Sequence, residues 1–583
     1  MTQPSVAAVA AHNSIVNPDG TTNRIWLSSY VKGVAHDIDL HKYKSLNDYF
    51  DECIRKFRDR PGFVSIGTEM SYDRLDRLVN AFAGWLQSQG VKKGDRVAIM
   101  LPNTFQYPVA LFAVLRIGAV VVNVNPLYTP RELNHQLKDS GAETIVVMEN
   151  FAKTLQDAMA GTQIKRIVLT QIGDLLSDGM LNVKGRALNF VIRKVQKMVP
   201  AYSLPGTLWM RDALKVGAKV QVKRPEIKQD DLAFLQYTGG TTGVAKGAML
   251  THLNVLANCQ QALAFAEGQL TGDAETVVTP LPLYHIFSLT VNCLIFMALG
   301  GRNILIANPR DTKRVMMILK KENFSGITCV NTLYASFLDD PDFRKRDFSN
   351  LKLAVAGGMA LQRSIAERWH EVTGNNIVEG YGLTECSPIV TQAPVDINNP
   401  GPVFSGSIGV PVPSTEVRMR RDDGSWADIG EPGELCVRGP QVMKGYWQRP
   451  EDTAKTIDSE GWLATGDIAV FDEKGFIKIV DRKKDMILVS GFNVYPNEIE
   501  DVLASHPDVK EVAAIGVPDE VAGERVKVII VPRTPGLTKE SVIEHCRKNL
   551  TGYKIPRVVE FRDTELPKSP VGKILRRELR DGK

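Results

Sequence analysis

Short apolar, β-branched runs alternate with longer helical patterns along the middle of the chain. Between about residue 94 and residue 480, the strand candidates are 96–101, 119–124, 144–148, 166–170, 303–307 and 353–357. Several of them are separated by segments of helical length, such as residues 310–323. Alternation of this kind predicts layered α/β subdomains whose sheets are mostly parallel.

The pattern changes near residue 480. The C-terminal part reads as strand, helix, two strands, helix and strand, which predicts a small α+β domain. The DRKKD stretch at 481–485 is charged and lacks glycine and proline, so we interpret it as a defined hinge. The expected organisation is a loose tail over 1–24, a large domain over 25–481, a hinge over 482–485 and a mobile C-terminal domain over 486–583.

The segment LNFVIRKVQKMVPAY has apolar residues at helical spacing and a basic opposite face. A basic amphipathic helix over 184–199 can lie on an anionic membrane surface. The same pattern also fits a surface helix that packs its apolar side on the core. The apolar positions are Leu188, Val191, Ile192, Val195, Met198 and Val199, and the basic ones are Lys184, Arg186, Arg193, Lys194 and Lys197.

Composition narrows the class of protein. Of the 583 residues, 44% are hydrophobic and 23% are charged, which is typical of a globular protein, and a net charge of +5 is too small to indicate nucleic-acid binding. The seven cysteines include no C-x-x-C pair, which favours a reducing compartment over a disulfide or zinc framework. The most apolar stretch, 281–301, is interrupted by His285, Ser288 and Asn292, so we expect a cytoplasmic protein without a membrane span.

The stretch YTGGTTGVAKG at 237–247 combines four glycines, three threonines and one lysine. Glycines let backbone N–H groups approach an anion, hydroxyls donate hydrogen bonds and lysine adds charge, so the stretch predicts an anion-binding loop. It differs from a nucleotide-binding P-loop because Lys246 follows Ala245 and precedes Gly247, where that motif needs Gly-Lys-Ser/Thr. Taken alone, it also fits an ordinary glycine-rich turn.

Further motifs follow this loop in the chain. AGGMAL at 356–361 places a glycine pair after a predicted strand, and EGYGLTE at 379–385 combines an aromatic ring, a hydroxyl and a carboxylate. TGD at 465–467 and the DRKKD stretch add a carboxylate and a guanidinium near the domain boundary. PKSPVGKILRREL at 567–579 places Lys573 in a loop near the C-terminus.

These motifs, in this order, resemble the adenylate-forming superfamily of acyl-CoA synthetases, luciferases and peptide-synthetase adenylation domains. The resemblance runs from about residue 45 to 580 and is strongest to the bacterial long-chain fatty acid–CoA ligases. It implies a large α/β adenylation domain with a small mobile C-terminal domain. It also implies ATP and CoA as co-substrates, Mg²⁺ as the cofactor and a fatty acid as the acid substrate.

The resemblance also implies roles for particular residues in ATP binding. Tyr381 and Gly382 would lie against adenine, which Gly357 and Gly358 would let approach, and Asp467 and Arg482 would hold the ribose. Thr384 would contact phosphate and Glu385 would bind Mg²⁺, a hard cation that prefers oxygen ligands. The β- and γ-phosphates would be held by Thr238, Gly239, Gly240, Thr241, Thr242, Gly243 and Lys246.

Other implied roles concern the two steps of acid activation. Lys573 would bring the acid carboxylate and the α-phosphate together, because two anions need a cation at their point of contact. The small domain would then rotate about Lys484, and Ser490 and Gly491 would line the path of CoA. His285 would lie beside the acyl carbonyl; the alternative is a half-buried histidine with satisfied hydrogen bonds.

The acid itself is less tightly defined. The LPLYHIFSLTVNCLIF stretch contains no acidic residue for an amino-acid ammonium group, and its Leu, Ile, Phe and Val side chains at 286–296 can wall an apolar channel. A medium-chain or aryl acid–CoA ligase is therefore an alternative, and a membrane-associated acyl or ATP sensor is a non-enzymatic one. The sequence does not decide between a monomer and a homodimer.

Overall fold

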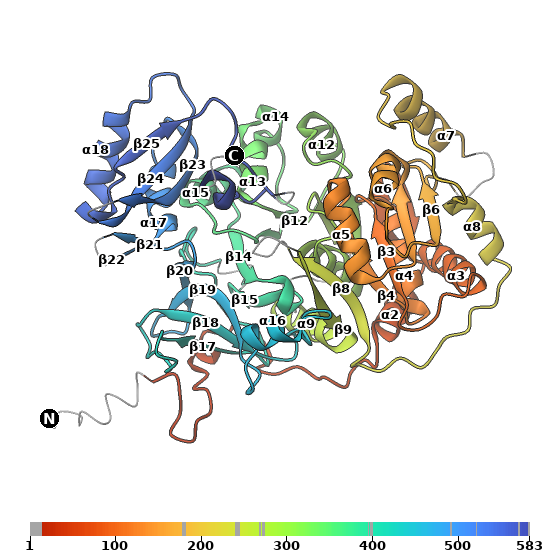
Figure 1. Cartoon of the computed structure of the whole chain (residues 1–583), viewed down its shortest axis with the longest axis horizontal. Helices are drawn as coiled ribbons and strands as arrows, with labels where there is room; N and C mark the ends of the chain where they lie inside the picture. Colours follow the sequence, from red (N-terminus) through yellow and green to blue (C-terminus); the bar gives the residue numbers. More distant parts are fainter. Residues whose placement is uncertain are drawn as a thin grey trace.

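The computed structural model describes residues 14–177, 182–238, 245–266, 270, 275–394, 396, 400–489, 492–519, 522–569 and 572–580. Four sheets organise these residues, and helices flank them (Figure 1). The prediction of an α/β protein with a small C-terminal α+β unit is confirmed, and the reason is visible in the two largest sheets.

The seven-stranded sheet has the order β7-β6-β5-β3-β4-β8-β9 and is parallel except for the β8–β9 pair. Its central strands are apolar on both faces: all five residues of β5 are buried, because helices cover the sheet. The strands are β3 (Arg96–Met100), β4 (Val120–Asn123), β5 (Thr144–Met148), β6 (Arg166–Thr170), β7 (Leu208–Trp209), β8 (Leu232–Thr238) and β9 (Lys246–Thr251).

The nine-stranded sheet has the order β16-β15-β14-β13-β12-β10-β11-β1-β2, with a parallel centre and antiparallel edges. Its strands are β1 (Pro61–Ser65), β2 (Thr68–Ser71), β10 (Thr276–Thr279), β11 (Arg302–Leu305), β12 (Gly326–Cys329), β13 (Leu353–Ala356), β14 (Ile377–Gly382), β15 (Ile389–Gln392) and β16 (Val410–Pro411). The predicted strands of both sheets are therefore present, with ends that differ by one or two residues.

Helices pack on both large sheets. Around the seven-stranded sheet lie α2 (Leu46–Phe57), α3 (Tyr72–Ser88), α4 (Gln106–Arg116), α5 (Pro130–Ser140), α6 (Ala152–Ala158), α8 (Met210–Gly217) and α9 (His252–Ala266). The nine-stranded sheet is accompanied by α12 (Thr312–Leu319), α13 (Asn331–Asp339) and α15 (Arg363–Thr373). The helix expected at 310–323 is thus α12, which is shorter at both ends.

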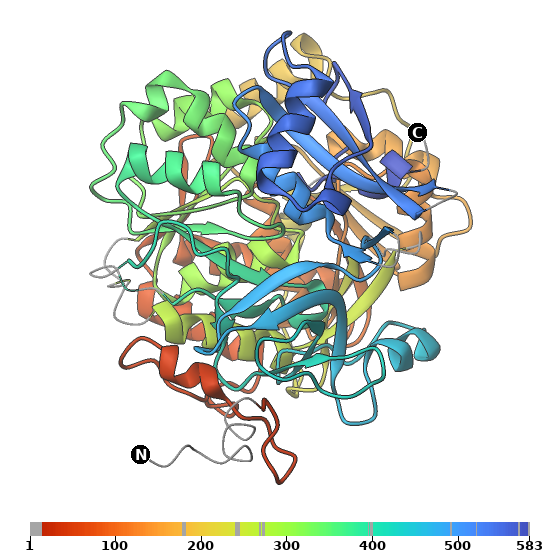
Figure 2. The same cartoon turned by 90° about the vertical axis from the view of Figure 1, so that its left-hand side faces the viewer.

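Two smaller sheets complete the fold, and their strand pairs are antiparallel except for the parallel β24–β25 pair. The first has the order β17-β18-β19-β20, with β17 (Glu416–Arg420), β18 (Gly433–Arg438), β19 (Leu463–Phe471) and β20 (Ile477–Arg482). The second contains β21 (Ile487–Val489), β22 (Phe492–Val494), β23 (Val509–Asp519), β24 (Gly523–Pro532) and β25 (Val558–Phe561), with α17 (Pro496–Ala504), α18 (Lys539–Asn549) and α19 (Arg576–Arg580). Figure 2 shows this C-terminal part above the β17–β20 sheet and beside the helices of the nine-stranded sheet.

Part of the N-terminal segment is packed against the β17–β20 sheet. Ile15 is buried, the Arg418 guanidinium donates a 2.9 Å hydrogen bond to the Thr22 hydroxyl, and Arg418 also contacts the Gly20 carbonyl. Residues 14–24, assigned to a loose tail from their sequence, are therefore held on the protein by a buried arginine.

The basic amphipathic segment forms α7 (Val183–Phe190) followed by a π-helical turn over Val191–Val195. The helical region ends four residues before the predicted end, and Lys197 has a left-handed φ of 52°. Ile192 is buried, whereas Phe190, Val191, Val195 and Met198 are exposed. Three of the six residues of the predicted apolar face, Val191, Val195 and Met198, are therefore not packed on the core.

Candidate active site

The glycine-rich loop connects the antiparallel strands β8 and β9. Thr238 ends β8, Lys246 begins β9, and these two residues are paired in register. The predicted phosphate-binding residues between them, Gly239, Gly240, Thr241, Thr242 and Gly243, lie outside the described residues.

Tyr446 contacts both Lys246 and Glu385. The Lys246 ammonium lies 3.0 Å from an Asp452 carboxylate oxygen and 5.3 Å from the centroid of the Tyr446 ring. The Tyr446 hydroxyl donates a 2.7 Å hydrogen bond to Glu385 Oε1. Burial raises the pKa of Glu385, and the Tyr446 hydroxyl and Lys246 oppose that rise. The structure thus places the predicted phosphate lysine and the predicted metal ligand on one side of the site.

Glu385 fits a magnesium ion that is held mainly by phosphate. Among the described residues, no cluster of three or more His, Cys, Asp or Glu side chains is arranged to hold a metal. Mg²⁺ in nucleotide sites takes one or two carboxylates and fills its other positions with phosphate oxygens and water. A single buried carboxylate beside a phosphate-binding loop is consistent with this coordination.

The predicted adenine site is formed by the ends of β13 and β14. Gly357 and Gly358 follow β13, and Gly358 has a left-handed φ of 81° with open space where a side chain would be. A Cβ atom at Gly357 would lie 3.1 Å from the Phe287 ring. Gly382 is the last residue of β14, and a Cβ atom there would lie 2.1 Å from the Pro388 carbonyl oxygen, so only glycine fits at this position. These glycines allow close backbone approach on both sides of Tyr381.

Tyr381, Asp467 and Arg482 come together at this edge. The Tyr381 hydroxyl donates a 2.6 Å hydrogen bond to Asp467 Oδ2, which fixes the orientation of the aromatic ring. Asp467 on β19 pairs in register with Arg482 on β20, and Arg482 Nε lies 3.5 Å from Asp467 Oδ1. Because a carboxylate has several acceptor positions, Asp467 can accept further hydrogen bonds while it holds Tyr381.

Lys573 reaches the same place from the C-terminal end of the chain. Its pKa is lowered to about 7, mainly by burial and also by the charges of Arg482 and Arg576, which Asp467 partly opposes. A Cβ atom on the preceding residue, Gly572, would lie 2.9 Å from the Thr332 hydroxyl, so the loop is seated against the start of α13. The small C-terminal unit therefore carries a lysine into a site built by the large one.

His285 caps the short helix that follows it. Its Nδ1 accepts a 3.3 Å hydrogen bond from the Phe287 backbone N–H, and burial lowers its pKa to about 4. The ring is therefore neutral at physiological pH. The apolar run after it forms a fully buried π-helix over Leu289–Ile295, a type of helix that occurs often at functional sites.

The remaining predicted residues occupy the expected segments. Thr384 precedes Glu385 in a 3₁₀ turn, and the exposed Lys484 lies in the turn after β20. Ser490 and Gly491 lie outside the described residues. Tyr446 and Asp452 were not predicted from the sequence because they lie in segments without a recognised pattern; the aromatic pair in the KGYW stretch was the available signal for Tyr446. Arg576 lies within the recognised 567–579 motif, but that motif suggested a role only for Lys573.

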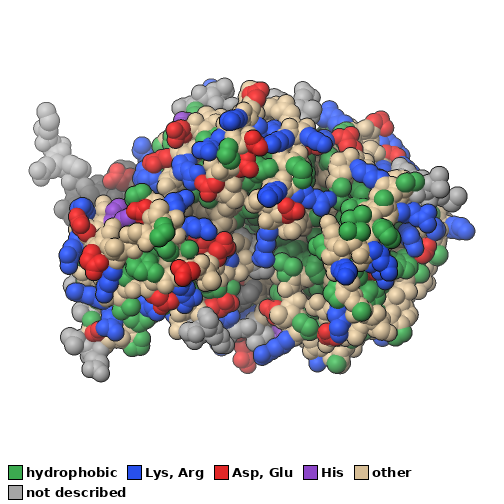
Figure 3. Space-filling model, turned by 90° about the horizontal axis from the view of Figure 1, so that it is seen from above, with side chains coloured by type: hydrophobic (Ala, Val, Ile, Leu, Met, Phe, Trp, Pro, Cys, Tyr) green, Lys and Arg blue, Asp and Glu red, His purple; other side chains and the backbone are tan. Residues whose placement is uncertain are grey.

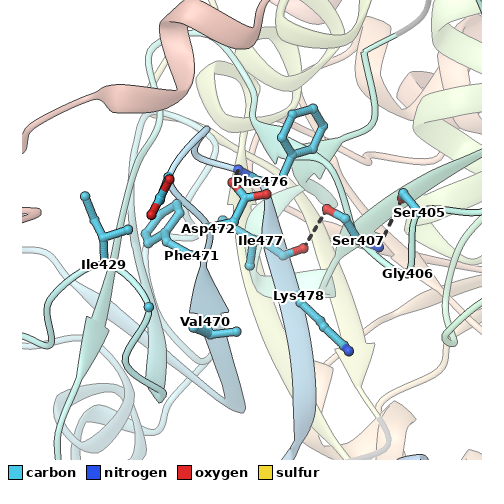
Figure 4. Close-up of a pocket in the computed structure, with 12 residues that line it drawn as sticks. Ser405, Gly406, Ser407, Ile429, Val470, Phe471, Asp472, Phe476, Ile477 and Lys478 are labelled. Carbon is cyan, nitrogen blue, oxygen red and sulfur yellow. Dashed lines mark hydrogen bonds between the residues drawn. The ribbon is translucent and has the colours of Figure 1, made fainter. Parts of the chain in front are cut away.

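A separate cavity of about 450 Å³ opens between β19, β20 and the loop at 405–407 (Figure 4). The Ser407 hydroxyl donates a 2.8 Å hydrogen bond to the Ile477 carbonyl at its wall. Phe471 and Phe476 also line this cavity, whereas the candidate site residues do not. The cavity is therefore distinct from the site around Lys573.

Three comparisons relate the chain to known proteins. It is 55% identical to the long-chain-fatty-acid–CoA ligase of Escherichia coli O157:H7 over 559 residues, which cover 96% of this chain and 98% of that one. The anthranilate CoA ligase AuaEII in complex with anthranoyl-AMP shares its fold, with a TM-score of 0.80 at 24% identity over 94% of this chain and 99% of that one. The o-succinylbenzoate CoA synthetase MenE of Bacillus subtilis, with ATP and magnesium, has a TM-score of 0.72 at 25% identity over 91% of this chain and 98% of that one.

Family models match both parts of the chain. The model of the AMP-binding enzyme C-terminal domain matches residues 498–573, which include Lys573. The model of the AMP-binding enzymes matches residues 50–447, which include both ends of the glycine-rich loop, Tyr381 and Glu385. The chain thus belongs to the AMP-binding, adenylate-forming enzymes.

Proposed function

We propose that this protein is an AMP-forming long-chain fatty acid–CoA ligase, which converts ATP, a fatty acid and CoA into acyl-CoA, AMP and diphosphate. The near full-length identity of 55% to a ligase of that specificity supports the substrate class. The observation that carries the reaction type is that the loop of Lys573 is seated against the start of α13, with Lys573 close enough to the Asp467–Arg482 pair to interact electrostatically with both.

In the first step, a carboxylate oxygen of the fatty acid attacks the α-phosphorus of ATP, and the bond to the β-phosphate breaks. Lys573 stabilises the two anions where they meet, and Lys246 and the loop at 238–246 hold the diphosphate that leaves. Tyr381, fixed by Asp467, orients the adenine ring, and Thr384 contacts phosphate. Mg²⁺ bound at Glu385 would neutralise phosphate charge.

In the second step, the CoA sulfur attacks the acyl carbon of the acyl-AMP, and AMP leaves. Lys573 must withdraw first, because the thiol needs the position that the lysine occupies. We infer that residues 486–583 rotate as a body about Lys484 in the 482–485 hinge, relative to residues 25–481. Ser490 and Gly491 would then line the path of CoA, and His285 would lie beside the acyl carbonyl.

Release of AMP with and without CoA tests this proposal. Acetate, octanoate, palmitate and benzoate are compared with ATP and magnesium, and palmitate is expected to give the highest kcat/KM. Each buried methylene contributes about 0.8 kcal/mol, so a long chain binds more tightly in an apolar channel. A preference for octanoate or benzoate would favour the medium-chain or aryl alternative. Absence of AMP with every acid would favour the non-enzymatic sensor.

The exposed side of α7 supports a second element of the proposal, peripheral contact with an anionic membrane. Among the described residues, none of the helices is long and apolar enough to cross a bilayer. Phe190, Val195 and Met198 are 62%, 65% and 55% exposed, and Lys194 and Lys197 are exposed beside them. Figure 3, which looks down on this end of the molecule, shows hydrophobic side chains among Lys and Arg over its right-hand part.

Exposed apolar side chains can insert into a membrane surface, and neighbouring lysines can pair with its anionic headgroups. Such a surface also holds the fatty acid substrate. We therefore propose that the enzyme is cytoplasmic and contacts the cytoplasmic face of the inner membrane peripherally. Flotation with vesicles of phosphatidylglycerol and phosphatidylcholine tests it: Phe190→Ser with Lys194→Gln should reduce flotation, whereas Lys215→Gln, a change of an exposed lysine on α8, should not. Equal flotation of all three proteins would contradict the membrane contact.

A further inference from the structure

A buried cluster of charges surrounds Arg576, the first residue of α19. The Arg576 guanidinium donates to both carboxylate oxygens of Glu500, at 2.9 and 2.6 Å, and to Asp481 Oδ1 at 3.3 Å. It also lies 3.4 Å from Asp485, which Arg580 contacts at 3.0 Å. The Asp481 side chain is 0% exposed and that of Arg576 is 12% exposed. The cluster is therefore shielded from solvent, where ion pairs depend strongly on geometry.

The cluster joins three segments that are far apart in sequence. Asp481 belongs to β20, Glu500 belongs to α17, and Arg576 follows the Lys573 loop. Asp481 Oδ2 also accepts a 2.8 Å hydrogen bond from the Asn497 backbone N–H at the start of α17. Asp481 therefore connects the end of β20 to two elements of the C-terminal unit.

Hydrogen bonds connect the described residues on either side of Lys573. The Ser569 N–H donates to the Lys573 carbonyl at 2.7 Å, and the Lys573 N–H donates to the Ser569 hydroxyl at 3.1 Å. The Leu575 N–H donates to the Pro567 carbonyl at 2.8 Å, immediately before Arg576. Because Arg576 follows Lys573 by three residues in this hydrogen-bonded segment, a displacement of Arg576 is expected to displace Lys573.

We propose that Arg576 and Asp481 are positioning residues that hold Lys573 at the nucleotide for the acid–AMP step and separate before the CoA step. This inference rests on the proposed ligase function and on rotation about the 482–485 hinge. Asp481 precedes that hinge, next to the ribose residue Arg482, whereas Glu500 and Arg576 follow it. In a rotation, the Arg576–Glu500 pair moves as a unit, and the Arg576–Asp481 pair breaks.

The pairing with Asp481 is thus specific to the arrangement in which Lys573 lies beside Asp467. Arg576 is suited to this role because its planar fork can bind Glu500 through two nitrogens and still reach Asp481. A lysine at the same position would keep the charge but could not make all of these contacts. Arg576→Lys therefore tests the geometry of these contacts while a positive charge remains near the three carboxylates.

The test measures the two half-reactions separately in the full-length enzyme. Palmitate-dependent exchange of diphosphate into ATP reports the first step, and acyl-CoA formation from supplied palmitoyl-AMP reports the second. Arg576→Lys and Asp481→Asn are each expected to lower the exchange rate about 10- to 100-fold, because small displacements of a catalytic group cost rates of this order. Acyl-CoA formation should change less than about twofold, because Lys573 has no part in that step. Arg577→Gln, a change of an exposed arginine on the same helix, is the matched control.

A double-variant cycle distinguishes positioning from general destabilisation. If Arg576 acts through Lys573, Arg576→Lys has no further effect on exchange in a Lys573→Ala background. The inference would be overturned if the losses of exchange rate from Arg576→Lys and Lys573→Ala were additive. It would also be overturned if Arg576→Lys and Asp481→Asn, with wild-type Tm, lowered both half-reactions equally. If Arg576→Lys does not fold, Asp481→Asn decides by the same criteria. Absence of exchange in the wild-type enzyme would instead refute the proposed function.

Discussion

Replacement of Lys573 by glutamine tests the central step of the proposed reaction. The Lys573 ammonium is expected to lie between the acid carboxylate and the α-phosphate. Two unit charges about 4 Å apart interact by about 4 kcal/mol at an effective dielectric of about 20. Loss of one such interaction from the transition state corresponds to about a 10³-fold lower rate. Lys573→Gln should therefore reduce palmitate-dependent diphosphate exchange about 10³-fold.

The pH dependence supplies an independent check. The pKa of Lys573 is about 7, whereas its ordinary value is 10.5. Because the protonated ammonium is the active form, kcat/KM for the first half-reaction should be full below pH 7 and fall as the pH rises through about 7. The residual activity of Lys573→Gln should lack this fall. The assay is initial-rate exchange from pH 5.5 to 9, with ATP and magnesium saturating and palmitate varied.

Stability should change in the opposite direction to activity. The two pKa values differ by about 3.5. Keeping Lys573 charged in the folded enzyme therefore lowers the free energy of unfolding by at most about 5 kcal/mol. The folded enzyme binds fewer protons than the unfolded chain between pH 7 and 10.5, so the free energy of unfolding rises with pH in that window. Lys573→Gln should remove this rise and should not lower Tm at pH 7. Equal loss of exchange and of acyl-CoA formation from palmitoyl-AMP would refute the role of Lys573.

Three further substitutions probe other parts of the site. Asp467→Asn should raise KM for ATP about 10- to 100-fold in steady-state assays, because it removes a charged acceptor that also holds Tyr381; an unchanged KM would argue against a ribose contact. Gly382→Ala should lower the free energy of unfolding by about 1–3 kcal/mol or more in urea, because its Cβ would collide with the Pro388 carbonyl; a wild-type midpoint would contradict that. Gly491→Leu should block acyl-CoA formation and spare exchange, and loss of both would oppose a CoA path at this position.

Local chemistry explains why much of the site was predictable. Glycines, threonines and a lysine in YTGGTTGVAKG specify an anion-binding loop through properties of the residues themselves. The buried parallel strands, such as β5, were recognisable because they are apolar on both faces. Resemblance then assigned roles to Tyr381, Glu385 and Lys573, and the structure brings Tyr381 to Asp467 and Lys573 to Arg482.

Contacts between distant segments were decided only by the tertiary structure. Asp481 and Arg576 are 95 residues apart, and Tyr446 and Glu385 are 61 apart, and no period or local motif encodes either pair. Periodicity likewise showed that residues 184–199 have an apolar face, but not whether anything covers it. A helical pattern fixes which side chains share a side of a helix, whereas the rest of the chain determines what packs against that side. The sequence by itself thus determined the chemical type of the site residues and the positions of the helices and strands. The tertiary structure decided which of these groups are in contact, because the burial of a side chain depends on neighbours that are remote in sequence.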